Sequence, residues 1–148
     1  VYAWDATGAS SGSGNWLRLD KIESNNPDTL TNLSESMGFW VHITGSSPVT
    51  LVISGTLPTT TTIPLRVAAG GWNLIGFPSS SAVALPGALS TLSPNYSLVF
   101  SYRAADTADP WKMYDPYAAP YASDLAQMAP GWGYWIKISE DASLNVSY

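Results

Sequence analysis

An aromatic strand pattern occurs twice in this chain of 148 residues, as GFWVHI at residues 38–43 and as GYWIKI at residues 133–138. With the two stretches aligned, the same offset of 95 residues pairs further residues on their N-terminal side. The pairs are Trp16 with Trp111, Asp20 with Asp115, Leu30 with Leu125, Leu33 with Met128, Met37 with Trp132, Trp40 with Trp135 and Ile43 with Ile138. Because several of these residues are rare types, the matches indicate an internal duplication, which restricts the chain to folds built from two similar units.

The two predicted repeats are not equally complete. The second begins near Pro64, whereas Val1 corresponds to Val99, so the first repeat lacks an opening segment. Either the chain continues before Val1 in a longer protein, or one opening segment serves both repeats. We therefore divide the chain into a shortened first repeat (1–57), a Thr/Pro connection (58–63) and a complete second repeat (64–148). The connection has the composition of a linker, but it can equally form an edge strand, because Thr favours strands.

Hydrophobic periodicity predicts strands in both copies of the aromatic pattern, because apolar residues alternate with the others. This alternation places Trp40 and Trp135 on the face opposite the core, so we expect them to be the best exposed rings, one presented by each repeat. The predicted core residues are Phe39, Val41, Ile43, Tyr134, Ile136 and Ile138.

Further stretches rich in β-branched and aromatic residues predict additional strands. They are TLVIS (50–54), WNLIGF (72–77), LVFSY (98–102) and SLNVSY (143–148). Only PDTLTNLSE (27–35), LPGALSTL (85–92) and SDLAQMAP (123–130) suggest short helices, each of about two turns, with Asp28 placed to cap the first and Ser123 or Asp124 the last. We predict an all-β protein in which two pseudo-symmetric halves form a β-sandwich or barrel-like module with two or three short helices.

Composition and charge exclude several classes of partner. The net charge is −5 and the six basic residues are scattered along the chain, which argues against binding to a nucleic-acid backbone. No apolar run approaches the roughly 18 residues of a membrane span, so no membrane partner is expected. Only 11% of the residues are charged, and small polar residues fill the connections, which is typical of extracellular β proteins.

The order GWNLIGFP, YSLVFSY, WKMYDP and LAQMAPGWGYWI resembles a repeat module found near the C-termini of secreted and cell-surface bacterial proteins, behind hydrolase or adhesin regions. The resemblance covers residues 64–148 completely and the latter two thirds of the pattern in residues 1–55. It implies an extracellular location and a non-catalytic accessory role beside an attached catalytic or surface domain. The first repeat departs from the pattern at Ser36 and Met37, so a role of Trp132 does not carry over to it.

The sequence predicts no catalytic residues and no cofactor. His42 is the single histidine, so a multi-histidine metal site is not expected. The G-x-S-x-G match GASSG at residues 8–12 lies in a Gly/Ser-rich stretch and serine is abundant throughout, so it does not specifically indicate a nucleophile elbow. The acidic loop RAADTADPWKMYDP offers Asp106, Asp109 and Asp115 as weak candidates for a structural calcium site, because calcium prefers oxygen ligands. Asp in such loops also commonly forms local turns.

An excess of aromatic residues is the strongest functional signal, with seven Trp and eight Tyr in the chain. Tryptophan is costly to bury completely unless its N–H finds a partner, so we expect some of these rings at the surface. Trp72 is expected in the core. The candidates for stacking against a ligand are Trp40, Trp135, Trp132, Trp111, Trp16 and Tyr114.

These patterns predict a non-catalytic carbohydrate-binding module that holds a secreted polysaccharide-degrading enzyme near its substrate. An exposed aromatic ring can stack on the C–H face of a pyranose, and polar neighbours can satisfy the sugar hydroxyls. The alternative is a structural or adhesive surface module whose Trp residues seal an interface, either between its own halves or with neighbouring protein. A small hydrolase is a weaker third hypothesis.

Overall fold

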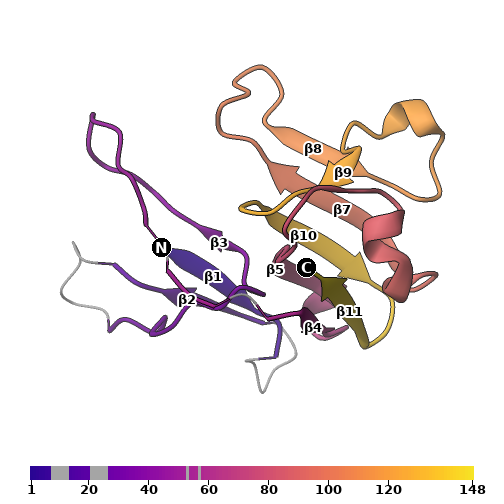
Figure 1. Ribbon diagram of the computed structural model, residues 1–148, viewed down its shortest axis with the longest axis horizontal. Helices are drawn as coiled ribbons and strands as arrows, with labels where there is room; N and C mark the ends of the chain where they lie inside the picture. Colours follow the sequence, from indigo (N-terminus) through magenta and orange to yellow (C-terminus); the bar gives the residue numbers. More distant parts are fainter. Residues whose placement is uncertain (8–13, 21–26, 53, 57) are drawn as a thin grey trace.

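The protein is all-β, as predicted, and its paired strands run antiparallel (Figure 1). The computed structural model describes residues 1–7, 14–20, 27–52, 54–56 and 58–148. Within these ranges, helical structure is confined to three short 3₁₀ helices: η1 (Ala69–Gly71), η2 (Gly87–Leu92) and η3 (Pro120–Ala122). None of the helices in the described ranges could cross a membrane.

A four-stranded sheet, here called the C-terminal sheet, is the largest element of the fold. Its order is β5 (Trp72–Gly76), β10 (Gly133–Ile138), β7 (Tyr96–Tyr102) and β8 (Trp111–Tyr114). Tyr134, Ile136 and Ile138 are buried on one face of β10, as their alternation predicted. The other face of this strand carries Trp135.

Smaller elements cover the inner face of the C-terminal sheet. Strand β4 (Thr60–Leu65) pairs with β11 (Ala142–Ser147), and β6 (Val83–Ala84) pairs with β9 (Gln127–Met128). Helix η2 completes the layer with three buried residues. The Thr/Pro stretch is therefore a strand rather than a free linker. The core cluster contains Ile63, Leu65, Ile75, Phe77, Ala88, Leu89, Leu92, Tyr96, Val99, Leu125, Met128, Tyr134, Ile136, Ile138, Leu144 and Val146.

Residues 1–40 contribute a second sheet, the N-terminal sheet, with the order β2 (Asn15–Arg18), β1 (Tyr2–Asp5) and β3 (Phe39–Trp40). It lies beside β5 in Figure 1, on the side away from β10. The link to β5 is an antiparallel bridge between Met37 and Ile75, reinforced by a 2.9 Å hydrogen bond from the Gly76 N–H to the Ser36 carbonyl. Strand β5 therefore has partners on both of its edges.

Strand order and register agree between the two sheets. Strands β2-β1-β3 follow the same order as β8-β7-β10, and both sets are antiparallel. The register pairs Trp4 with Trp16 and Tyr2 with Trp40 in the N-terminal sheet, and Tyr102 with Trp111 and Phe100 with Trp135 in the C-terminal sheet. Each of these pairs falls at positions that the sequence alignment makes equivalent.

Two of the three predicted helices are absent. Residues 27–34 are irregular, and residues 123–130 contain strand β9; only the predicted helix at 85–92 has a helical counterpart, η2. The reason is that the side chains expected to cap these helices accept hydrogen bonds from neighbouring backbone instead. Asp28 Oδ1 accepts from the Asp20 N–H at 2.7 Å, and Asp124 Oδ1 accepts from the Met113 N–H at 2.7 Å.

The predicted core of the first repeat is also wrong in part. Val41 and Ile43 are 45% and 48% exposed, and Phe39 is half-buried. The predicted strand at 50–54 is not formed at its described residues, where Leu51 is 63% exposed; Ile53 lies outside the described residues. In the C-terminal sheet the corresponding residues are covered by β4, β5 and η2, and no equivalent layer exists among the described residues of the N-terminal part.

The glycine that opens each aromatic strand has a steric function. A Cβ on Gly38 would lie 2.6 Å from the Ile75 carbonyl oxygen and 2.9 Å from Leu74 Cδ1. A Cβ on Gly133 would lie 3.8 Å from the Cα of Gly38. The two glycines therefore sit close together, and Leu74, only 8% exposed, packs against both.

We predict that Gly38→Ala lowers the free energy of unfolding by about 2 kcal/mol, because the new methyl group collides with backbone that cannot rotate away. Gly45→Ala is the matched control, since a Cβ at Gly45 meets nothing within 4 Å. Urea unfolding followed by tryptophan fluorescence measures both variants. Equal stability of the two variants would contradict this packing.

Candidate aromatic groove

Each sheet gathers its aromatic side chains on one face. In the N-terminal sheet, Trp4 lies directly opposite Trp16, and Tyr2 lies directly opposite Trp40. Side chains at directly opposed positions share a face, and so do residues two apart along one strand. All four rings therefore lie on the same side of this sheet.

The C-terminal sheet repeats this arrangement with Phe100, Tyr102, Trp111 and Trp135. The ring centroids of Trp4 and Trp16 are 5.2 Å apart at an interplanar angle of 66°, and those of Tyr102 and Trp111 are 5.1 Å apart at 65°. Both pairs are edge-to-face, a favourable geometry for aromatic rings.

The two aromatic faces meet through reciprocal contacts. Trp135 of the C-terminal sheet lies 5.8 Å from both Trp4 and Trp16, measured between ring centroids. Trp40 of the N-terminal sheet lies 5.1 Å from Tyr102 and 5.7 Å from Trp111. Trp135 on β10 thus contacts the Trp4–Trp16 pair of the N-terminal sheet, and Trp40 on β3 contacts the Tyr102–Trp111 pair of the C-terminal sheet. We call these contacts the tryptophan clasp.

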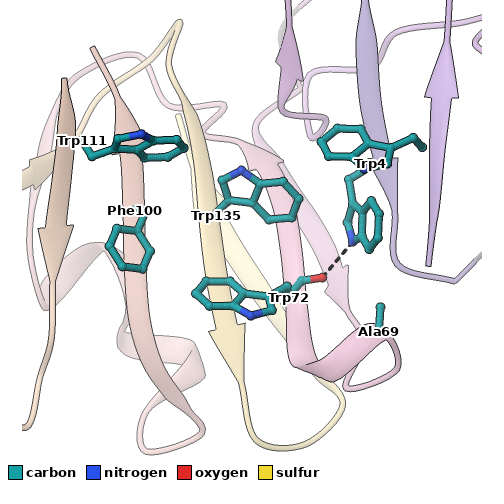
Figure 2. A pocket seen from close by; sticks show the side chains of 7 residues that line it. Trp4, Ala69, Trp72, Phe100, Trp111 and Trp135 are labelled. Carbon is teal, nitrogen blue, oxygen red and sulfur yellow. Dashed lines mark hydrogen bonds between the residues drawn. The ribbon is translucent and has the colours of Figure 1, made fainter. Parts of the chain in front are cut away.

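One hydrogen bond fixes the clasp to the backbone. The Trp4 Nε1–H donates to the carbonyl oxygen of Trp72 at 3.0 Å (Figure 2). Because a half-buried indole N–H without an acceptor is destabilising, this bond both satisfies Trp4 and ties β1 to β5.

An open groove of about 570 Å³ lies between the two sheets. Figure 2 shows the rings of Trp72, Phe100, Trp111 and Trp135 on one wall and Trp4 on the other. The full lining consists of Trp4, Trp16, Ala69, Trp72, Phe100, Trp111 and Trp135. Its surface is almost entirely apolar.

The side chains around the groove differ in exposure. Trp16 and Trp111 are 48% and 44% exposed, whereas Trp4, Trp72 and Trp135 are half-buried. The rings of Trp16 and Trp111 are therefore accessible to a ligand, whereas the less exposed rings of Trp4, Trp72 and Trp135 form the walls between the sheets.

The structure brings together three of the six predicted ligand-binding residues, Trp16, Trp111 and Trp135, in the groove. Trp40 and Trp135 were predicted to be the most exposed rings, but both are half-buried because the clasp covers them. Trp40 contacts Trp111 without lining the groove.

The remaining two predicted residues lie elsewhere. Trp132 is 40% exposed, with Arg103 Cζ stacked 3.6 Å from its ring centre. It lines a second groove, of about 740 Å³, whose lining also includes Phe39 and Phe77. Tyr114 packs against the core on the opposite face of the C-terminal sheet.

Sequence reasoning missed four lining residues: Trp4, Ala69, Trp72 and Phe100. Trp72 was predicted in the core, yet it lines the groove, because the face of β5 that carries Trp72 is turned toward the N-terminal sheet. Trp4 follows the buried Ala3, and Phe100 follows the buried Val99. Because side chains alternate between the two faces of a strand, this alternation could have predicted that both rings point away from the core.

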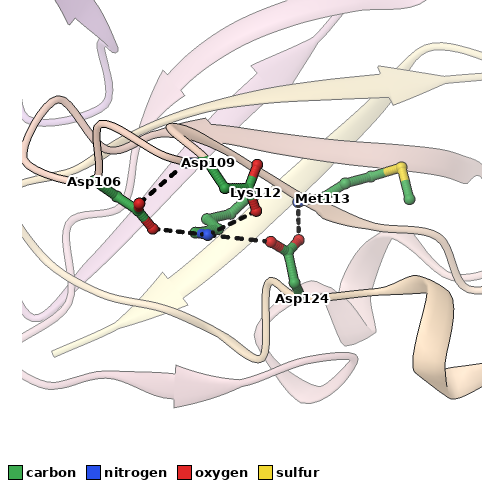
Figure 3. A network of polar contacts seen from close by, with 5 residues as sticks. All are labelled: Asp106, Asp109, Lys112, Met113 and Asp124. Carbon is green, nitrogen blue, oxygen red and sulfur yellow. Dashed lines mark hydrogen bonds and ion pairs between the residues drawn. The ribbon is translucent and has the colours of Figure 1, made fainter.

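In the acidic loop, the side chains of Asp106 and Asp109, which were considered as calcium ligands, bind the ammonium group of Lys112 instead. Lys112 Nζ lies 2.9 Å from Asp109 Oδ2, 3.0 Å from Asp106 Oδ2 and 3.4 Å from Asp124 Oδ2 (Figure 3). Asp115, the third candidate ligand, uses Oδ1 to accept from the Tyr117 N–H at 2.8 Å. Within the described ranges, no group of three or more acidic or histidine side chains is arranged to hold a metal ion.

This network shifts the pKa values of Asp106, Asp124 and Lys112. The hydrogen bond from Lys112 is the main cause that lowers the pKa of Asp106. Burial opposes ionisation of Asp124, but hydrogen bonds from the Met113 N–H and from Lys112 together lower the pKa of that carboxyl. Hydrogen bonds to Asp109 and Asp106 raise the pKa of Lys112.

Comparisons of the chain with protein-family models, with curated proteins and with solved structures gave no match. Functional inference therefore rests on the geometry of the chain itself.

The Lys112 network predicts a specific pH dependence of stability. Lowered carboxyl pKa values stabilise the fold above the unfolded-state value of 3.8, and this contribution is lost as the pH falls through the lower folded-state values. The raised Lys112 pKa contributes below 10.5, and its contribution is lost only at more alkaline pH.

We expect Lys112→Met to flatten the loss of stability between about pH 5 and 3, because the carboxyl pKa values return toward their usual range. Urea midpoints across this pH range measure the effect, with Lys137→Met as the control on another strand. An acid limb of unchanged steepness in Lys112→Met would show that the three carboxylates are not held by this lysine.

Proposed function

We propose that this chain is a non-catalytic carbohydrate-binding module and that the aromatic groove is its binding site. The observation that carries the proposal is the gathering of five tryptophans and Phe100 around one open groove. Rigid, flat, apolar surfaces of this kind suit the C–H faces of pyranose rings, because stacking removes apolar area of both partners from water.

The position of the rings on strands supports this assignment. Trp16 and Trp111, the most exposed of the lining tryptophans, lie on β2 and β8, so each ring is held by a sheet rather than by a loop. A ligand that enters between them loses little free energy to ordering of the protein. Lys137, whose Nζ lies 5.6 Å from the Trp72 ring centre, provides a nearby donor for a sugar hydroxyl.

The groove favours one shared site over two separate ones. The sequence suggested that Trp40 and Trp135 each present a ring on its own repeat, but the clasp occupies both of them. We propose instead that both sheets contribute walls to a single site, with Trp16 on the N-terminal side and Trp72, Phe100 and Trp111 on the C-terminal side.

We also propose that the two sheets belong to duplicated repeats related by an approximate twofold axis. Equal strand register and the reciprocal ring contacts support this relation, because contacts of an isologous interface occur in pairs. A secreted or cell-surface location and an accessory role beside an attached enzyme remain part of the proposal, on the basis of composition and of the module that the sequence resembles.

A structural or adhesive module is the alternative, and the clasp is the observation that favours it. Eight of the aromatic pairs involve a tryptophan of the clasp, and several are edge-to-face. Rings engaged in this way can serve to seal the two sheets together without any ligand.

Retention on polysaccharides separates these functions. We expect affinity electrophoresis against xylan, β-glucan and mannan, and pull-down on cellulose and chitin, to show binding to at least one polymer. Trp16→Ala and Trp111→Ala should each weaken binding about tenfold or more, as expected for an aromatic anchor. Tyr121→Ala, at a residue 93% exposed and outside the groove, should leave binding unchanged.

Circular dichroism of each variant controls for folding, which should survive because each single substitution leaves the Trp4–Trp72 hydrogen bond and the Trp4–Trp135 and Trp40–Tyr102 ring contacts in place. Failure of the wild-type protein to bind any polymer in the panel would favour the structural alternative. Binding that is insensitive to both tryptophan variants would place a carbohydrate site elsewhere.

A further inference from the structure

The side chains that line the aromatic groove offer hydrogen-bond donors but no hydrogen-bond acceptors. The lining of five tryptophans, Phe100 and Ala69 contains no hydroxyl, amide or carboxylate side chain. The polar group of tryptophan is its indole N–H, which only donates. Of the five indoles, only that of Trp4 has a hydrogen-bond partner in the described part of the chain, the Trp72 carbonyl. The other four N–H groups are therefore available to a ligand.

These four donors are accessible on both walls of the groove. Trp16 on the N-terminal side and Trp111 on the C-terminal side are each nearly half exposed. Trp72 and Trp135 are half-buried, but no buried side-chain nitrogen or oxygen of the described residues is without a partner. The N–H groups of Trp72 and Trp135 therefore reach solvent as well.

An ammonium group lies beside the groove and adds further donors. Lys137 follows Trp135 by two positions on β10, so both side chains lie on the same face of the C-terminal sheet. Lys137 is directly opposite Trp72 in the register of β10 and β5, and its Nζ lies 5.6 Å from the centre of the Trp72 ring. None of the ion pairs between described residues involves Lys137.

No acidic side chain shares the aromatic face of either sheet among the described strand residues. Asp5, the single acidic residue in the strands of the two sheets, alternates with Trp4 and lies on the other face of β1. Lys112, which holds the three aspartates of the acidic network, alternates with Trp111 and lies on the other face of β8. The side chain charge beside the groove is thus positive, although the net charge of the chain is −5.

We propose that the ligand of the aromatic groove is an acidic polysaccharide, with a uronate carboxylate bound to Lys137 and pyranose rings stacked on the tryptophans. This inference rests on the proposed carbohydrate-binding function and names the class of polysaccharide. A carboxylate only accepts hydrogen bonds, so it complements a site whose side chains only donate. Hydrogen bonds between an ammonium and a carboxylate are also roughly twice as strong as those between neutral groups.

A neutral polysaccharide fits the groove less well. Each sugar hydroxyl carries a proton that needs an acceptor, and the lining side chains provide none. In a uronate, a carboxylate replaces the primary alcohol and is bonded directly to a ring carbon. One sugar unit can therefore stack on the groove wall and reach Lys137 beside Trp72.

Oligosaccharides of alginate, polygalacturonate and β-1,4-linked polyglucuronate test this inference on the full chain. Each is paired with the same oligosaccharide after reduction of its carboxylates to primary alcohols, which keeps the rings and linkages. By isothermal titration calorimetry at low ionic strength, we expect at least one acidic form to bind at least tenfold more tightly than its reduced partner. This preference should largely disappear at about 1 M salt, where screening acts within about 3 Å.

Variants of Lys137 assign the preference to this side chain. Lys137→Met keeps the length of the apolar stem and should remove the preference, so that acidic and reduced oligosaccharides bind equally. Lys137→Arg should restore it, because a guanidinium also binds carboxylates. Arg103→Met is the matched control at a basic residue that stacks on Trp132 outside the groove, and it should keep the preference. Circular dichroism checks the folding of each variant.

The outcomes separate this inference from the function on which it rests. Equal or tighter binding of the reduced oligosaccharides to the unmodified chain would overturn the inference and leave carbohydrate binding intact. A preference for the acidic forms that persists in Lys137→Met would also overturn it, because the carboxylate would then bind elsewhere. Absence of binding by every oligosaccharide, acidic and reduced, would contradict the proposed function itself and the inference with it.

Discussion

The arrangement of the two sheets depends on the tryptophan clasp, in which Trp40 and Trp135 each pack against an aromatic pair of the other sheet. Of the apolar residues described in the N-terminal sheet and the segment after it, only Ala3 and Leu30 are buried, and neither belongs to the main core cluster. Hydrophobic burial within this part is therefore too small to order it alone. Its position is set by the clasp, by Leu74 against the paired glycines and by the hydrogen bond from Trp4 to Trp72.

This dependence explains why the aromatic groove lies between the two sheets, where their tryptophan faces meet. One face carries Trp4 and Trp16 and packs toward the C-terminal sheet, where it forms the walls of the proposed carbohydrate site. The other carries Phe39, with Leu33 and Leu51 nearby, and faces a space that no described residue fills. The N-terminal sheet is thus covered by the C-terminal sheet on the side that carries its tryptophans.

Sequence reasoning identified the strand class and the burial of Tyr134, Ile136 and Ile138, because alternation over six residues is a strong local signal. It could not show that Val41 and Ile43 are exposed, since burial depends on whether another segment covers the strand and not on the strand's own pattern. Trp16, Trp111 and Trp135 were among the candidate stacking residues, and the structure brings these three rings to one groove. Trp4 and Trp72 were missed, because their contacts join residues far apart in the sequence. Two helices were wrong because Asp28 accepts a hydrogen bond from the Asp20 N–H and Asp124 accepts one from the Met113 N–H on β8, contacts that local propensity cannot predict.

A double-mutant cycle on Trp40 and Trp111 tests the clasp most directly. The two rings belong to different sheets and lie 5.7 Å apart between centroids. Urea unfolding of Trp40→Ala, Trp111→Ala and the double variant gives their coupling free energy, which we expect to be about 1 kcal/mol, as for other aromatic pairs in contact. Additive effects of the two substitutions, with a coupling free energy near zero, would show that the sheets are not held together by these rings and would contradict the account.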